Sequence, residues 1–253
     1  MKHLFIKLFK SLGYTFNPIV KDIRQHYPDI KDKEFWDIHQ LIRPYTMTSV
    51  ERMYALYNSV NHVLVNNIKG DFVECGVWRG GSSMLIANML ANRNSLDRKI
   101  YLYDTFEGMS EPSQEDLDFS GRNAAAMMKE TEDIKETSVW CLADLSDVTN
   151  NMKLTGFSMN NIVFVKGKVE DTIPQTMPDG DIALLRLDTD WYESTKHELI
   201  YLYPKLINNG ILIIDDYGHW EGCKKAVDEY FTENAKSILL SRIDYTGRVG
   251  VKI

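Results

Sequence analysis

Acidic side chains follow two apolar runs of the sequence, at the point where each run ends. Asp188 follows Ile182–Leu187, and Asp215 and Asp216 follow Ile211–Ile214. If the two runs are neighbouring parallel strands, their carboxyl ends bring the three acids to one spot. Crowded, buried carboxylates repel one another, and a hard divalent cation with oxygen ligands removes that cost. We therefore expect a Mg²⁺ site here; the alternative is that the acids only cap loops that face solvent.

Two further polar residues accompany this acidic set. His219 comes shortly after the acidic pair and is a candidate substrate contact, although a lone histidine is more often structural. Arg186 stands inside an apolar strand, so it requires a partner, which the sequence does not identify.

A glycine-rich turn separates an apolar run from a helical stretch within Phe72–Ser83. Gly76 and Gly80 would let the backbone approach a ligand closely, and Ser82 or the next serine can cap the helix that follows. The spacing is G-x-x-x-G-G, so the G-x-G-x-x-G fingerprint of dinucleotide-binding proteins is not met.

Two acids flank this turn along the chain. Glu74, in the strand before it, would repel a pyrophosphate and attract a cationic ligand or an amino group. Asp104 ends the next apolar run, one βαβ step further, where an acid can accept both hydroxyls of a ribose. The alternative for Asp104 is that it caps its own loop.

Short apolar runs would position these residues. They are Phe72–Cys75, Ile100–Tyr103, Ile162–Lys166, Ile182–Leu187 and Ile211–Ile214, with helical or polar stretches between them. Such runs suit strands covered on both faces, and alternation with helices suits a parallel sheet. Residues 238–242 and 248–252 read as a hairpin at the sheet edge. The predicted fold class is α/β, with a doubly wound, mostly parallel seven-stranded sheet.

We expect residues 1–253 to form a single domain. Residues 1–68 are predicted to be a helical lead-in or lid, and residues 69–253 the core. Residues 105–160 are too long for a simple crossover, so they should contain a flap. A tolerated surface insertion is the alternative.

Two helices are predicted outside the sheet alternation. One starts at Thr48 or Ser49, either of which can cap it, and carries an apolar stripe to Leu64. The other lies within the predicted flap, around Asn123–Thr131.

The composition excludes some classes of protein. The chain has 29 Lys+Arg against 36 Asp+Glu and a net charge of −7, which argues against nucleic-acid binding. No apolar run approaches the roughly 18 residues of a membrane span. The opening MKHLFIKLFKSL fits an amphipathic helix better than an export signal, and it could contact a second copy in a homo-oligomer. The three cysteines are too far apart for a CxxC pair, so we expect a cytoplasmic protein.

Four segments together resemble the macrocin O-methyltransferase family, over about residues 45–253. They are VECGVWRGGSS, LYDTFEGM, RLDTDWYESTKHEL and LIIDDYGHWEGCKKAVDEYF. Enzymes of that family methylate sugar hydroxyls of macrolides and related natural products with S-adenosylmethionine. The pattern E-x-G-x-x-x-G-x-S, a later acid and Gly167–Pro174 is also similar to catechol O-methyltransferase.

The resemblance implies a class I methyltransferase fold, S-adenosylmethionine and Mg²⁺ as cofactors, and a small sugar or glycoside as substrate. Carried over by position, the expected cofactor contacts are Glu74, Gly76, Gly80, Ser82, Asp104, Val169, Glu170 and Asp171, with Tyr45 and Ser59 as guesses from the lead-in. Asp188, Asp215 and Asp216 would hold the metal. The catechol enzyme has Asn at the last of these positions and a lysine base where this chain has Trp191, so Asp188 is the expected base.

Two other functions stay open at this point. One is an NAD-dependent oxidoreductase or epimerase on a similar fold, which the glycine spacing and Glu74 disfavour. The other is a non-catalytic binding module, which the three carboxylates disfavour. The acceptor is not determined by the sequence: an antibiotic glycoside, a capsule or lipopolysaccharide sugar and a nucleotide sugar all fit.

Overall fold

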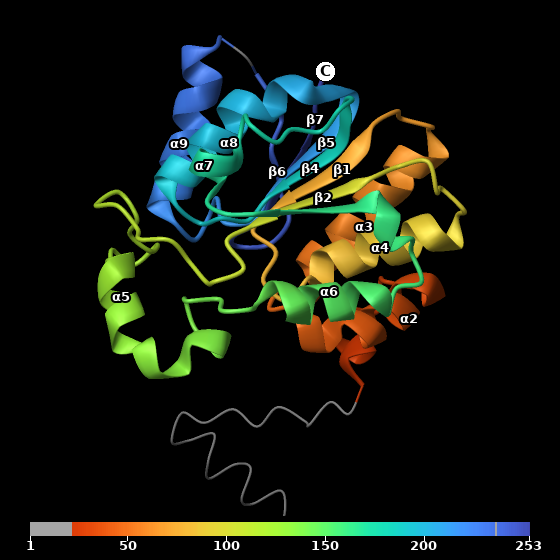
Figure 1. Ribbon diagram of the computed structural model, residues 1–253, viewed down its shortest axis with the longest axis horizontal. Helices are drawn as coiled ribbons and strands as arrows, with labels where there is room; N and C mark the ends of the chain where they lie inside the picture. Colours follow the sequence, from red (N-terminus) through yellow and green to blue (C-terminus); the bar gives the residue numbers. More distant parts are fainter. Residues whose placement is uncertain (1–21, 236) are drawn as a thin grey trace, which may run out of the picture. The chain divides into compact units, whose positions relative to one another are not determined.

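The computed structural model describes residues 22–235 and 237–253 and divides the chain into two units after Trp36 (Figure 1). The amphipathic helix predicted at the start of the chain lies outside the described residues. In the smaller unit, the 3-10 helix η1 (Ile23–His26) begins at Asp22, whose carboxylate accepts the amide hydrogen of Arg24. Helix α2 (Lys33–Ile42) begins in this unit.

A seven-stranded sheet forms the centre of the larger unit, in the order β3-β2-β1-β4-β5-β7-β6. The strands are β1 (Asp71–Cys75), β2 (Ile100–Asp104), β3 (Ile162–Lys166), β4 (Ile182–Leu187), β5 (Leu206–Ile214), β6 (Ser241–Arg242) and β7 (Arg248–Val251). Strands β1 to β5 are parallel, and the β6–β7 hairpin joins β5 in antiparallel pairing. The mostly parallel sheet and the edge hairpin are therefore confirmed.

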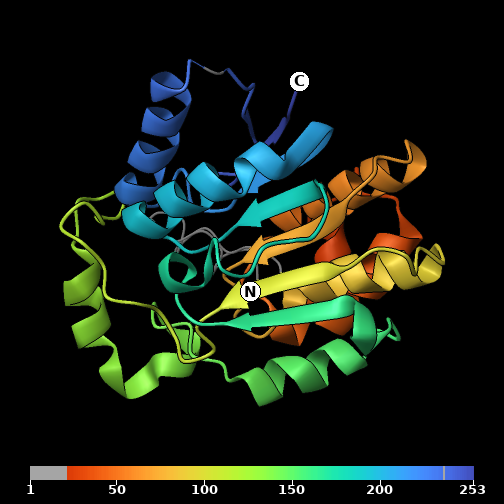
Figure 2. The same cartoon turned by 45° about the horizontal axis from the view of Figure 1, so that its top comes forward.

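Helices cover both faces of this sheet (Figures 1 and 2). On one face lie α3 (Val50–Val65), α4 (Gly81–Asn92) and α6 (Leu145–Lys153); on the other lie α7 (Val169–Thr172), α8 (Tyr192–Tyr201) and α9 (Glu221–Glu233). Short 3-10 helices complete the unit: η2 (Arg43–Tyr45), η3 (Glu132–Thr137), η4 (Met159–Asn161) and η5 (Tyr203–Lys205). Every residue of β4 is buried, as expected for a strand with two covered faces.

Helix α3 begins where the sequence predicts. The hydroxyl of Ser49 accepts the amide hydrogen of Arg52 at 3.1 Å, which satisfies one free donor of the first turn. The stripe of Met53, Val60 and Val63 is fully buried, and α3 packs against α4. The helix belongs to the larger unit, and the lid function of the lead-in stays a prediction.

The long connection between β2 and β3 has two parts. Its first part contains α5 (Ala124–Glu130), where a helix is predicted; Asn123 caps it. Its second part is α6, which buries Val148 and Met152 and packs on α4. Helix α6, in the second half of the predicted flap, is thus an ordinary helix of the layer that covers the sheet, and the flap itself stays a prediction. In the part of the chain that is described, no helix is both long enough and apolar enough to cross a bilayer.

Candidate active site

A cavity of about 390 Å³ opens at the carboxyl ends of the central strands. Its wall includes Gly76 after β1, Asp104 at the end of β2, Asp188 after β4, and Asp215 and Asp216 after β5. Parallel strands bring their carboxyl ends to the same sheet edge, so residues far apart in sequence meet in this one cavity.

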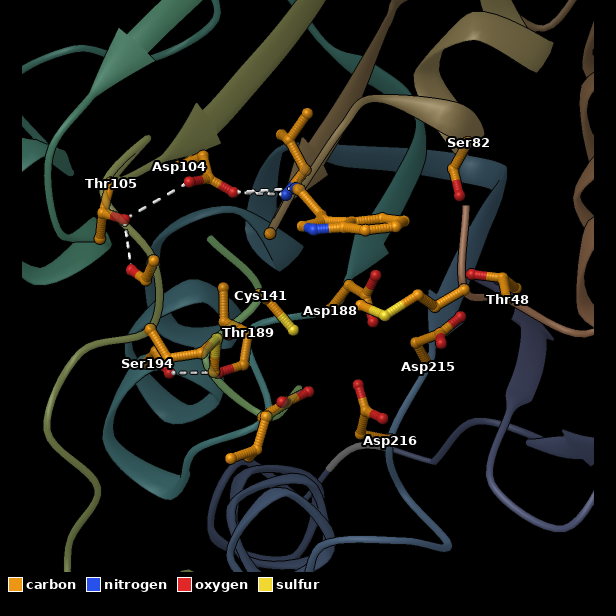
Figure 3. Close-up of a pocket in the computed structure, with 18 of the residues that line it drawn as sticks. Thr48, Ser82, Asp104, Thr105, Cys141, Asp188, Thr189, Ser194, Asp215 and Asp216 are labelled. Carbon is orange, nitrogen blue, oxygen red and sulfur yellow. Dashed lines mark hydrogen bonds between the residues drawn. The ribbon is translucent and has the colours of Figure 1, made fainter. Parts of the chain in front are cut away.

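Three carboxylates gather at one end of the cavity. One oxygen each from Asp188, Asp215 and Asp216 lies within 4.8 Å of the other two. The pairing of Leu187 with Ile214 across β4 and β5 places the residues that follow side by side. Figure 3 shows the three carboxylates turned toward a common space, with Asp104 apart from them. The predicted gathering of these acids is what the structure shows; we call them the acidic cluster.

Two arginines contact the acidic cluster. Arg186 Nη1 lies 2.6 Å from Asp188 Oδ2, and Arg186 Nη2 lies 2.7 Å from Asp215 Oδ1. Arg52, in the first turn of α3, also pairs with Asp215, and its Nε lies 3.1 Å from Asp244 Oδ2. The partner that Arg186 requires is therefore the cluster itself, together with Glu74.

The arginines do not neutralise the acidic cluster. Burial, opposed by Arg186 and reinforced by Asp215 and Asp216, raises the pKa of Asp188 well above its ordinary value. Burial and the neighbouring carboxylates also raise the pKa of Asp216, whose Oδ2 is buried without a hydrogen-bond partner. A group of oxygen donors with excess negative charge and an unpartnered buried oxygen fits a hard divalent cation such as Mg²⁺.

The glycine turn after β1 meets the loop after β4. Gly76 has φ of +80°, and a Cβ there would collide with the backbone of Asp188, so only glycine fits. Gly80, with φ of +90°, is the N-cap of α4. The expectation that Ser82 or Ser83 caps this helix is wrong, because both lie within its first turn.

Glu74 is not in the cavity wall, contrary to the contact expected with a cationic ligand. Its side chain is 1% exposed, and Oε1 lies 2.7 Å from Arg186 Nη1. Ser83 also donates its hydroxyl hydrogen to Glu74. Glu74 lies directly opposite Arg186 on the neighbouring strands β1 and β4, so its negative charge is compensated by Arg186 inside the protein.

Asp104 holds the glycine turn and also lines the cavity. Its Oδ2 accepts the amide hydrogens of Val77 at 2.6 Å and Trp78 at 3.2 Å, and its Oδ1 accepts that of Phe106 at 2.6 Å. Asp104 therefore does cap its own loop, as the alternative interpretation of this residue expected. A carboxylate has about four acceptor sites; three are used by these amides, and the Thr105 hydroxyl lies 3.5 Å from Oδ1. The ribose contact stays a prediction.

The other expected contacts divide into two groups. Tyr45, Ser82, Val169, Glu170 and His219 line the cavity, whereas Ser59, Gly80 and Asp171 do not. Ser59 is buried in α3 and donates its hydroxyl hydrogen to Ala55 O at 2.7 Å, so it faces its own helix. Asp171 is exposed on α7. Gly80 is the N-cap of α4, and the next residue, Gly81, lines the cavity in its place.

Sequence reasoning missed Arg52, which lines the cavity and contacts Asp215. A signal was available, since Arg52 lies in the first turn of a helix, where the helix dipole disfavours a cation. A cation at that position indicates an acidic partner from outside the helix.

Comparisons with known proteins identify the family of this chain. The profile of the family described as Macrocin-O-methyltransferase (TylF) matches residues 24–250. Demethyldecarbamoylnovobiocin O-methyltransferase of Streptomyces niveus is 34% identical over 186 residues, which cover 74% of this chain and 67% of the relative. A tetracenomycin-C 4'-O-methyltransferase of Streptomyces olivaceus, whose name specifies a rhamnosyl substituent, is 35% identical over 80% of this chain and 74% of its own.

A solved structure gives the same result. The structure of the O-methyltransferase NovP superposes with a TM-score of 0.72, at 31% identity over 82% of each chain. The doubly wound sheet with its cavity at the strand ends is therefore a class I methyltransferase fold, as expected. The chain belongs to the macrocin O-methyltransferase family and is an O-methyltransferase. The oxidoreductase and binding-module alternatives are thereby set aside.

Proposed function

We propose that this enzyme transfers a methyl group from S-adenosylmethionine to a sugar hydroxyl of a glycoside or glycan, with Mg²⁺ held by Asp188, Asp215 and Asp216. The observation that carries the proposal is that these three carboxylates, within 4.8 Å of one another, share one cavity with the glycine turn. The names of two relatives, which refer to novobiocin and to a rhamnosyl tetracenomycin, support a glycoside as acceptor.

The donor would occupy the part of the cavity nearest β1 and β2. Gly76 and Ser82 would border its methionine end, and Asp104 would contact its ribose. Val169 and Glu170, after β3, would lie near its adenine. Tyr45 and His219 are further wall residues, for the donor and the acceptor respectively.

The acceptor hydroxyl would sit at the acidic cluster. When bound there, Mg²⁺ lowers the pKa of a coordinated hydroxyl and orients it. Asp188 is the expected base, because its side chain is 26% exposed while that of Asp215 is 3% exposed, so Asp188 is the more open to the cavity. Its second oxygen, Oδ1, is not used by Arg186 and can accept the proton.

The wall residues must also align the reactants. The donor supplies an electrophilic methyl group, and its transfer to oxygen is an in-line displacement that needs the two atoms held at about 3 Å. Arg186 and Arg52 hold the carboxylates of Asp188 and Asp215, so the oxygen that reacts can be held at one position relative to the glycine turn.

The test is a methyl-transfer assay of the full chain with S-adenosylmethionine, MgCl₂ and a panel of aryl and methyl glycosides, with mass spectrometry of each product. We expect methylation of at least one glycoside, loss of activity with EDTA and recovery with Mg²⁺. Activity that is indifferent to EDTA would contradict the metal. Methylation of a catechol control but of no glycoside would contradict the sugar acceptor.

The cytoplasmic location and the homo-oligomer stay predictions. Cys75 and Cys223 are buried and all three cysteines are free thiols, in keeping with a reducing compartment. Light scattering of the purified protein would give the oligomeric state.

A further inference from the structure

Three aromatic side chains lie where the cavity meets solvent. His219 and Tyr245 line the cavity. The ring of Phe119 has its centre 5.5 Å from that of His219 and 6.0 Å from that of Tyr245. Phe119 is 64% exposed and Tyr245 is 54% exposed. We call these three residues the aromatic rim.

The rim residue Tyr245 is held in place relative to the acidic cluster. It lies in the turn between β6 and β7, and the next residue, Thr246, donates its hydroxyl hydrogen to Asp215 O at 2.7 Å. Gly218 donates its amide hydrogen to Thr246 O at 2.9 Å, and a Cβ at Gly218 would collide with Tyr245 O. The turn and the loop after β5 therefore pack backbone against backbone.

The segment that carries Phe119 is attached to the same loop. Glu221, at the start of α9, donates its amide hydrogen to Leu117 O at 2.9 Å, and Asp118 forms a β-bridge with Trp220. His219 precedes Trp220 and packs on it, with ring centres 4.8 Å apart. The segments that carry the three rim residues are thus attached to the loop after β5, although they come from different parts of the sequence.

The rings leave faces free for a ligand. Phe119 meets Tyr245 edge to face at 74° and is tilted by 60° to His219, so neither pair of rings is stacked. An exposed aromatic face beside a cavity gains free energy when a flat apolar group covers it.

The rim presents little charge. Asp118, which precedes Phe119 in the chain, is 5% exposed. Its Oδ1 accepts three hydrogens from Ser120 and Arg122 within its own loop. An uncharged ligand therefore suits this surface better than an ionic one.

We propose that the aromatic rim is the acceptor-specificity subsite, and that Phe119 and Tyr245 bind a flat, uncharged aglycone attached to the sugar that reacts. This inference rests on the proposed function, because the sugar is placed at the acidic cluster. The group attached to that sugar then extends toward solvent, across the rim.

The test compares matched acceptors in the methyl-transfer assay with saturating S-adenosylmethionine and MgCl₂. The acceptors are the 4-methylumbelliferyl and methyl α-L-rhamnosides, a rhamnose-containing disaccharide, and the same series for glucose, galactose and fucose. The enzymes are wild type, Phe119→Ala, Tyr245→Ala and Tyr245→Phe. The control is Tyr201→Ala, since Tyr201 is an exposed tyrosine with its ring near a histidine, His197, and outside the cavity wall.

We expect the wild type to have a KM about ten-fold lower for the aryl glycoside than for the methyl glycoside of the same sugar. Phe119→Ala and Tyr245→Ala should remove this preference, Tyr245→Phe should keep it, and Tyr201→Ala should not affect it. The affinity for S-adenosylhomocysteine, measured by calorimetry, should be unchanged in all variants.

Other results would contradict either the subsite or the proposed function. Equal KM values for aryl and methyl glycosides in the wild type, or a preference that survives both alanine variants, would overturn the subsite. A preference for the disaccharide over the aryl glycoside would also overturn it, because the rim would then bind a second sugar. Absence of transfer to every glycoside would instead refute the proposed function.

Discussion

Glu74 and Arg186 stand opposite one another on β1 and β4 and form an ion pair of 2.7 Å with side chains 1% and 2% exposed. The same guanidinium contacts Asp188 and Asp215. Arg186 therefore balances the charge of Glu74 inside the sheet and also contacts two carboxylates of the acidic cluster. A substitution at Glu74 would change the charge balance around Arg186 although Glu74 does not line the cavity.

Glu74→Gln should destabilise the protein strongly. Removing one charge of a buried pair leaves the other without full compensation, which costs about 3–5 kcal/mol. Urea denaturation measures the loss. The control is Asp228→Asn, which breaks an exposed pair with Lys224, with side chains 47% and 45% exposed, and should cost less than about 1 kcal/mol. Similar losses in both variants would contradict the structural role of Glu74.

Asp188→Asn should remove activity and keep donor binding. The variant lacks both a metal ligand and the expected base, so turnover should fall by about 10³-fold or more. The glycine turn and Asp104 are unchanged, so calorimetry with S-adenosylhomocysteine should give the wild-type affinity. Asp179→Asn, at an aspartate whose side chain is 82% exposed, is the control and should retain full turnover. Near-normal turnover in Asp188→Asn would remove this residue from the mechanism.

Alanine substitutions at three glycines should distinguish the cost of a steric collision from the cost of a positive φ. Gly76 has both a positive φ and a collision with the Asp188 backbone, Gly156 has a positive φ with open space, and Gly180 has open space alone. Alanine at Gly180 should be neutral or slightly stabilising, and at Gly156 should cost about 1–2 kcal/mol. Gly76→Ala should cost clearly more than Gly156→Ala. Thermal denaturation of the three variants checks the order, and equal losses at Gly76 and Gly156 would contradict the collision.

Asp244 should contribute stability that depends on pH. Burial raises its pKa, but the amide hydrogen of Gly247, the hydroxyl of Ser49 and the charge of Arg52 outweigh burial, so the folded-state pKa is lowered. A lowered pKa gives stability that is present above the unfolded value of about 3.9 and is lost as the pH falls through the folded value.

The difference in unfolding free energy between wild type and Asp244→Asn should therefore be about 1–3 kcal/mol near pH 7 and shrink below about pH 4. Urea titrations from pH 3 to pH 7 measure it. A difference that grows on acidification would contradict this assignment.

The strands and the acidic cluster were predictable from the sequence for the same physical reason. A strand covered on both faces must be apolar throughout, so Ile182–Leu187 and Ile211–Ile214 stand out, and parallel neighbours place their following residues together. The packing of α6 within the predicted flap was harder to predict, because the helix has few apolar residues and buries only Val148, Asn151 and Met152.

Contacts between distant residues were not predictable. Glu74 and Arg186 are 112 residues apart, and only the register of β1 and β4 shows that their charges meet. From the sequence alone, without that register, Glu74 is predicted to contact a ligand. Ser59 was misplaced for a similar reason: the sequence gives its position on a helix but not which side of the helix faces the cavity.

The turn at residues 244–247 has a consequence for protein synthesis. Asp244 binds Ser49 and Arg52 at the start of α3, and Thr246 binds the backbone of Asp215. A ribosome translates this turn after all these partners. Any nascent chain halted before it would have strands β1 to β5 but neither β7 nor the closure around the three aspartates, so an unfinished polypeptide should have no methylating activity.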